Sequence, residues 1–62
     1  MTVETAIMRL NDLIMEREEL SKLIQKEMKT GIPDDAKTSV LATVDFLKDE
    51  IQILKGILEE LQ

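Results

Sequence analysis

The sequence predicts an all-α protein, an antiparallel αα-hairpin, on three observations. Apolar residues recur three and four positions apart in both halves of the chain, which is the spacing of an amphipathic helix. Between the halves, the segment KTGIPDDA at 29–36 combines Gly31, which stops helices, with Pro33. A connection this short joins antiparallel neighbours. We therefore expect one domain over 1–62, with helices over about 2–29 and 35–61 and a corner at about 30–34.

The first helix is predicted from a broad apolar stripe. Thr2 can cap its N-terminus, and Glu4 follows in the first turn, where the helix macrodipole favours an acid. Arg17 interrupts the stripe. A charged residue there either sets the register or oligomeric state of a bundle, or extends to the edge and pairs with an acid. The stripe consists of Val3, Ala6, Ile7, Leu10, Leu13, Ile14, Leu20, Leu23, Ile24 and Met28.

The second helix carries a more regular pattern. Its apolar residues alternate steps of four and three, the heptad repeat of helices that pack lengthwise against a neighbour. Asp34 or Asp35 can cap its start. At the corner, Gly31 is expected to be left-handed, with Ile32 providing the apolar contact of a Schellman ending. The heptad residues are Val40, Val44, Leu47, Ile51, Leu54, Leu58 and Leu61.

A second apolar ridge lies off the heptad positions of the second helix. With Val44, Ile51 and Leu58 at heptad position a, Phe46 and Ile53 both fall at position c. Gly56 continues this line, and Ile57 adjoins it. A glycine inside a helix costs about 1 kcal/mol relative to alanine, so we expect another helix to approach closely there. The alternative is that these are scattered exposed apolar residues. With weaker candidates from the first helix, the predicted interaction surface is Met8, Met15, Arg17, Phe46, Ile53, Gly56 and Ile57.

The composition restricts both stability and function. The 62 residues contain no cysteine and no histidine, so disulfides and the usual ligands of zinc, haem and iron are missing. Two helices alone bury little surface, and a second copy of the chain is the simplest stabiliser. We therefore expect the hairpin to pair into a homodimeric four-helix bundle. The net charge of −5 disfavours nucleic-acid binding. No apolar run suits a membrane span or signal peptide, which predicts a cytoplasmic protein.

The length and layout resemble those of the small RNA-binding helical hairpins that dimerise into a four-helix bundle and regulate plasmid copy number. The resemblance implies RNA binding. Lys22, Lys26 and Lys29 form the one basic cluster in the sequence. Their place near the end of the first helix is equally explained by the helix macrodipole, which favours cations there.

The stretch 41–45 resembles the signature of the small sporulation phosphatases, helical hairpins that dephosphorylate a response regulator. That signature reads Ser-Gln-Glu-Leu-Asp about ten residues after a loop glycine. Counted from Gly31, Asp45 matches its last position, whereas Leu41 and Ala42 stand in place of the serine and glutamine. The resemblance implies hydrolysis of an aspartyl phosphate, with Asp45 at the site.

The function that we favour is a non-enzymatic protein-interaction module, a regulatory adaptor or inhibitor that acts as a homodimer on another protein. We predict no catalytic, cofactor-binding or metal-binding residue. The acidic second helix suggests a protein partner with a basic or mixed groove. The alternatives are a response-regulator phosphatase and an RNA-binding four-helix bundle.

Overall fold

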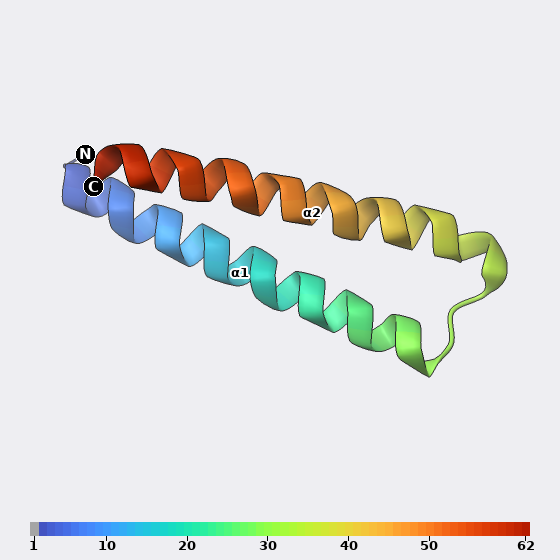
Figure 1. The fold of residues 1–62 in the computed structure, drawn as a ribbon. Helices are drawn as coiled ribbons and strands as arrows, with labels where there is room; N and C mark the ends of the chain where they lie inside the picture. The colour runs from blue at the N-terminus through green and yellow to red at the C-terminus, as the bar shows by residue number, and fades with distance from the viewer. Residues whose placement is uncertain (1) are drawn as a thin grey trace.

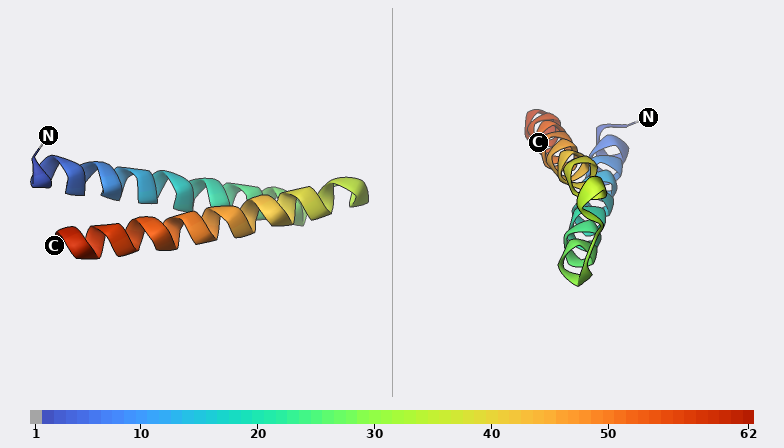
Figure 2. Two further views of the ribbon diagram at one scale, coloured as in Figure 1. Left: turned by 90° about the horizontal axis from the view of Figure 1, so that it is seen from above. Right: turned by 90° about the vertical axis from the view of Figure 1, so that its right-hand side faces the viewer.

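Two long helices make up the computed structural model, which describes residues 2–62. Helix α1 spans Val3–Thr30 and helix α2 spans Asp34–Leu61. They pack against each other as an antiparallel hairpin, with the chain ends together at one end and the connection at the other (Figure 1). The hairpin is a rod 46 Å long and 15 Å across, in which the helices cross at a shallow angle (Figure 2). The predicted all-helical hairpin is confirmed.

The start of each helix is fixed in a different way. At α1, the backbone N–H of Thr5 donates to Thr2 Oγ1 at 3.1 Å, which confirms the predicted cap. At α2 the N-cap residue is Pro33, which makes no side-chain cap. The prediction that Asp34 or Asp35 caps α2 is therefore wrong. Both acids lie in the first turn instead, where they face the positive end of the helix macrodipole.

The connection turns at Gly31. Its φ of 112° is positive, as expected for a glycine that ends a helix. Its ψ is also 112°, far from the value of about 47° that defines the left-handed helical region. The chain therefore leaves α1 in an extended direction rather than through the predicted Schellman ending, and α2 begins three residues later.

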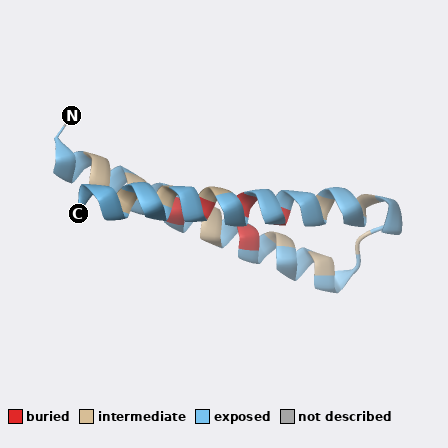
Figure 3. Ribbon diagram, turned by 45° about the horizontal axis from the view of Figure 1, so that its top comes forward, coloured by how far each residue is buried: buried red, intermediate tan, exposed pale blue. Residues whose placement is uncertain are grey.

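The core lies in the middle of the hairpin, and the ends are more exposed (Figure 3). The central heptad residues of α2 are buried, whereas Leu61 at its end is exposed. This gradient follows from the architecture, because each end of a two-helix layer has neighbours on one side only. The buried residues are Ile14, Ser21, Val44, Leu47 and Ile51.

Helix α1 contacts α2 through a narrower line of residues than the predicted stripe. Leu13, Leu20 and Leu23 belong to that stripe in the sequence, yet all three are exposed. One neighbouring helix covers only the a and d positions of the heptad, and these three leucines fall at other positions. The line that faces α2 is Ile7, Leu10, Ile14, Arg17, Ser21, Ile24 and Met28, all buried or half-buried.

Candidate interaction surface

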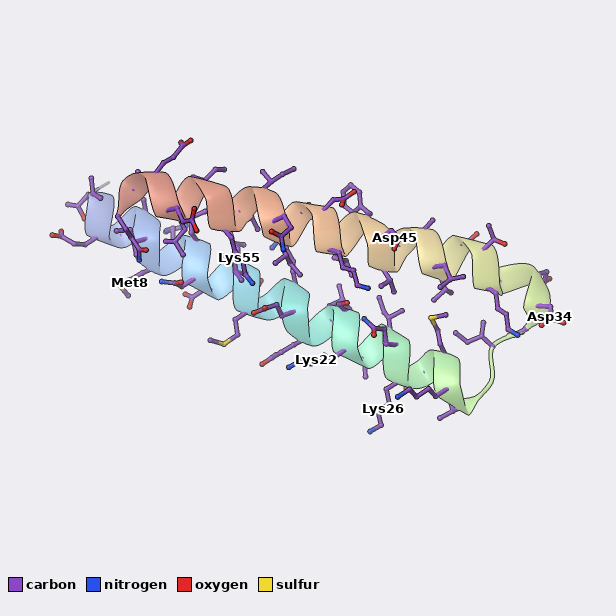
Figure 4. All side chains as sticks on the ribbon, in the orientation of Figure 1. Met8, Lys22, Lys26, Asp34, Asp45 and Lys55 are labelled. Carbon is purple, nitrogen blue, oxygen red and sulfur yellow. The ribbon has the colours of Figure 1, made fainter. Side chains whose placement is uncertain are left out.

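The heptad positions divide the hairpin into two sides. With Ile14 and Ile51 at position a, antiparallel packing places the e positions of both helices on one side and the g positions on the other. An ion pair supports this register, because Glu18 Oε2 and Lys55 Nζ, both at e, lie 3.6 Å apart. Figure 4 shows Lys55 reaching from α2 towards α1. Each c position adjoins a g position and belongs to the same side.

Six exposed apolar side chains gather on the g side. They come from both helices, occupy g or c positions, and are between 36% and 64% exposed. In a square four-helix bundle a second neighbour lies about a quarter turn from the first, which is the direction of position g. We call this surface the apolar face. It consists of Leu13, Leu20 and Leu23 of α1 with Phe46, Ile53 and Ile57 of α2.

An ion pair crosses the same side of the hairpin. Arg17 Nε donates to Glu50 Oε1, and Arg17 Nη1 donates to the backbone oxygen of Leu13 at 3.2 Å. Both charged side chains are less than a third exposed, at 28% and 30%. Arg17 therefore extends from its d position to the edge and pairs with an acid, which confirms one of the two predicted roles. Glu50 was not predicted from the sequence. Its g position, which lies beside the g side of an antiparallel neighbour, is the signal that could have identified it.

The apolar face surrounds this ion pair along the length of the hairpin. Arg17 and Glu50 are paired and so mark one level. The helices run in opposite directions, so residues before Arg17 share levels with residues after Glu50. About one turn towards the chain ends are Leu13 and Ile53, and about one turn towards the connection are Leu20 and Phe46.

The structure does not bring the other predicted surface residues to the apolar face. Met8 and Met15 are exposed but fall at position b, on the e side. Gly56 falls at position f, on the outer side of α2. Among the described residues, no atom outside its own helical surroundings lies within 4 Å of where a Cβ would stand. Of the seven predicted residues, the structure groups Arg17, Phe46, Ile53 and Ile57.

The e side carries an open groove near the connection, with a volume of about 360 Å³. Asp45, the residue singled out by the phosphatase signature, lines it together with Lys29 and Lys48. Lys22 and Lys26 project from α1 away from α2 (Figure 4). Lys22, Lys26 and Lys29 recur four and three residues apart and so share one face of α1, but of the three only Lys29 lines the groove. The remaining residues that line the groove are Gln25, Met28, Leu41 and Val44.

Comparison of the chain with protein families, curated proteins and solved structures found no match. Neither helix of residues 2–62 has a stretch long and apolar enough to cross a membrane. Within that range, no three His, Cys, Asp or Glu side chains are grouped to hold a metal ion. The apolar face with its ion pair is thus the candidate interaction surface.

Proposed function

We propose that this protein is a non-enzymatic interaction module, a regulatory adaptor or inhibitor that acts as a homodimeric four-helix bundle. The observation that carries the proposal is the apolar face, on which six exposed apolar side chains of both helices lie on one side of the hairpin. A contiguous apolar surface on a small protein marks an interaction site. The occupant that we propose is the apolar face of a second copy.

The exposed area of the hairpin supports a second copy. The chain exposes 4901 Å². A compact monomer of 7.1 kDa is expected to expose about 4,100 Å², roughly 800 Å² less. A standard protein interface buries about 800 Å² on each partner. The surface that the hairpin exposes in excess of a compact monomer is therefore the amount that one ordinary interface covers.

The energetics of burial point the same way. Burial of a large apolar side chain stabilises a protein by about 1.5–3 kcal/mol, and Phe46 and Ile53 are both about two-thirds exposed in the single chain. Among residues 2–62, the core of one hairpin contains four buried apolar residues, and the chain has no cysteine for a disulfide. Small helical scaffolds of this kind need a further stabiliser, and dimerisation through the apolar face supplies one.

The dimer leaves a different surface for a protein partner. Met8 and Met15 stay exposed on the e side, and methionine side chains adapt to varied contact surfaces. Each chain carries a net charge of −5, which favours a partner with a basic or mixed groove. These properties suit an adaptor or inhibitor that binds a larger protein through the e side of the hairpin.

The mass in solution tests the dimer. Light scattering at micromolar concentration should give twice the 7.1 kDa chain mass, and the melting temperature should rise with protein concentration. A fully helical monomer of constant melting temperature would contradict the dimer. The apolar face would then be open to a different protein.

Retention of a partner tests the adaptor role. The immobilised dimer should retain one defined protein from an extract of its source organism. Exchange of Met8→Ser together with Met15→Ser should abolish retention while the dimer mass persists. Equal retention by both forms would contradict a role for these methionines. Loss of aspartyl phosphate from a response regulator, dependent on Asp45, would favour the phosphatase instead.

A further inference from the structure

We infer that the two hairpins of the dimer point in the same direction, with both connections at one end, so that Arg17 of each faces Glu50 of the other. This arrangement rests on the proposed dimer and adds its geometry. The ion pair lies in the centre of the apolar face and is therefore covered when two such faces meet.

Each member of the ion pair has bonding capacity left. Arg17 uses Nε and Nη1, and within residues 2–62 its Nη2 has no acceptor. Over the same range Glu50 accepts through Oε1, and its Oε2 accepts from no donor. Burial of a charged group without hydrogen-bond partners is strongly unfavourable. A dimer that covers the apolar face must therefore present an acceptor near Arg17 and a donor near Glu50.

Two symmetric arrangements bring the apolar faces together, because a two-fold interface pairs the same surface on both copies. When the axis runs along the hairpin, both hairpins point the same way and α1 faces α2 of the partner. When the axis runs across the hairpin, they point in opposite directions and α1 faces α1 of the partner. The two arrangements differ in which charges meet.

The charges favour the first arrangement. With hairpins in the same direction, Arg17 lies against Glu50 of the partner subunit, and the four charges alternate in a closed ring. With hairpins in opposite directions, Arg17 lies against Arg17 of the partner subunit, and the two glutamates also meet. Like charges placed together at an interface cost several kcal/mol. Only the ring provides Nη2 with an acceptor and Oε2 with a donor.

The apolar residues accept both arrangements, so they do not decide between them. In the same direction Leu13 meets the partner's Ile53, and Leu20 meets the partner's Phe46. In opposite directions Leu13 meets the partner's Leu20, and Phe46 meets the partner's Ile53. Both sets pair large side chains with large ones. The ion pair is the feature that distinguishes one direction from the other.

A charge-swap experiment separates the two arrangements. The double variant R17E/E50R keeps an ion pair within the chain, so its hairpin should fold, with helicity measured by circular dichroism as the check. Its mass equals that of the natural chain, so it is labelled with ¹⁵N, mixed in equal amounts with the unlabelled natural protein, and analysed by native mass spectrometry. Random pairing would place half of all dimers in the mixed form.

The same-direction ring predicts that mixed dimers are depleted about fivefold or more, because mixing places Arg beside Arg and Glu beside Glu. An excess of mixed dimers above one half would show opposite directions and overturn the inference. A random proportion would show that the charges do not meet and would also overturn it. Failure of the unmixed, unsubstituted protein to dimerise is a different result, since it refutes the proposed dimer itself.

A distance measurement gives an independent readout. The natural chain has no cysteine, so Thr38→Cys places one nitroxide label on exposed α2 near the connection. In the same direction the two labels lie across one end of the bundle, about 20–25 Å apart for helices of ordinary diameter. In opposite directions they lie about 36 Å or more apart along the rod. The longer distance would overturn the inference.

Discussion

Arg17 of α1 and Glu50 of α2, 33 residues apart in the sequence, form an ion pair at the centre of the apolar face. Arg17 occupies a d position, which in a coiled coil is usually apolar. A polar or charged residue at such a position can specify which arrangement of helices forms, at a cost in stability. We therefore expect the pair to act as a determinant of arrangement rather than as a source of stability.

Replacement of the whole pair should keep or raise stability. In the double variant Arg17→Leu with Glu50→Leu, apolar packing replaces two charges that dimerisation would bury, so the free energy of unfolding should be unchanged or higher by about 1–4 kcal/mol. Arg17→Leu alone should lower it, because Glu50 then loses its partner. Guanidinium unfolding at one fixed protein concentration measures both. A double variant less stable than the single variant would contradict this explanation.

The two glycines should respond to alanine in opposite ways. At Gly31 the positive φ is strained for any residue with a Cβ, so Gly31→Ala should lower the free energy of unfolding by about 1–3 kcal/mol. At Gly56 the chain is helical and the added methyl meets open space, so Gly56→Ala should raise it by about 1 kcal/mol. Thermal unfolding measures both variants. A loss of stability at Gly56 would indicate that another helix approaches there closely.

Burial predicts which aliphatic residues stabilise the packing of α1 against α2. Ile51 is 7% exposed, and truncation of such a core residue costs about 2–5 kcal/mol. In a small two-helix core, Ile51→Ala should therefore remove most of the helicity at 25 °C. Leu41 on the e side is about half exposed, and Leu41→Ala is the matched control that should change the helicity little. Equal effects in circular dichroism would contradict the observed packing.

The hairpin could be predicted from the sequence because its signals are local. The strict four-three spacing of α2 needs only the helical repeat, and Gly31 with Pro33 is enough to place the turn. The start of α2 was less predictable, since Pro33 and the two following acids compete for the N-cap position. Pro33 occupies the N-cap position, and the two acids lie in the first turn, where the helix macrodipole favours them.

The face that α1 presents to α2 could not be predicted as well. Its apolar residues lie on more than one side of the helix, and two positions on the line that faces α2 are polar. Ser21 is buried there with its Oγ accepting from Gln25 Nε2 at 3.0 Å, and Arg17 reaches across to Glu50. The predicted stripe was built from apolar residues alone. It therefore included Leu13 and Leu20 and took no account of the polar residues that face α2. Their exposure depends on the position of α2 and needed the structure.

The apolar face itself yields the last prediction. Exchange of Phe46→Ser and Ile53→Ser removes two of its most exposed large side chains without touching a residue buried in the single chain. Because dimerisation would bury both, the variant should lose at least tenfold in dimer affinity, measured by analytical ultracentrifugation. Helicity at low concentration should fall as well, since an isolated hairpin with four buried apolar residues is marginally stable.

The matched control for this variant is Met8→Ser with Met15→Ser. These methionines are as exposed as Phe46 and Ile53, but they lie on the e side, so their exchange should leave the dimer affinity within about twofold. Equal weakening by both variants would mean that loss of helix stability, and not loss of the interface, separates the chains. Persistence of the dimer in the Phe46 and Ile53 variant would show that the copies meet elsewhere, and the apolar face would then belong to another protein.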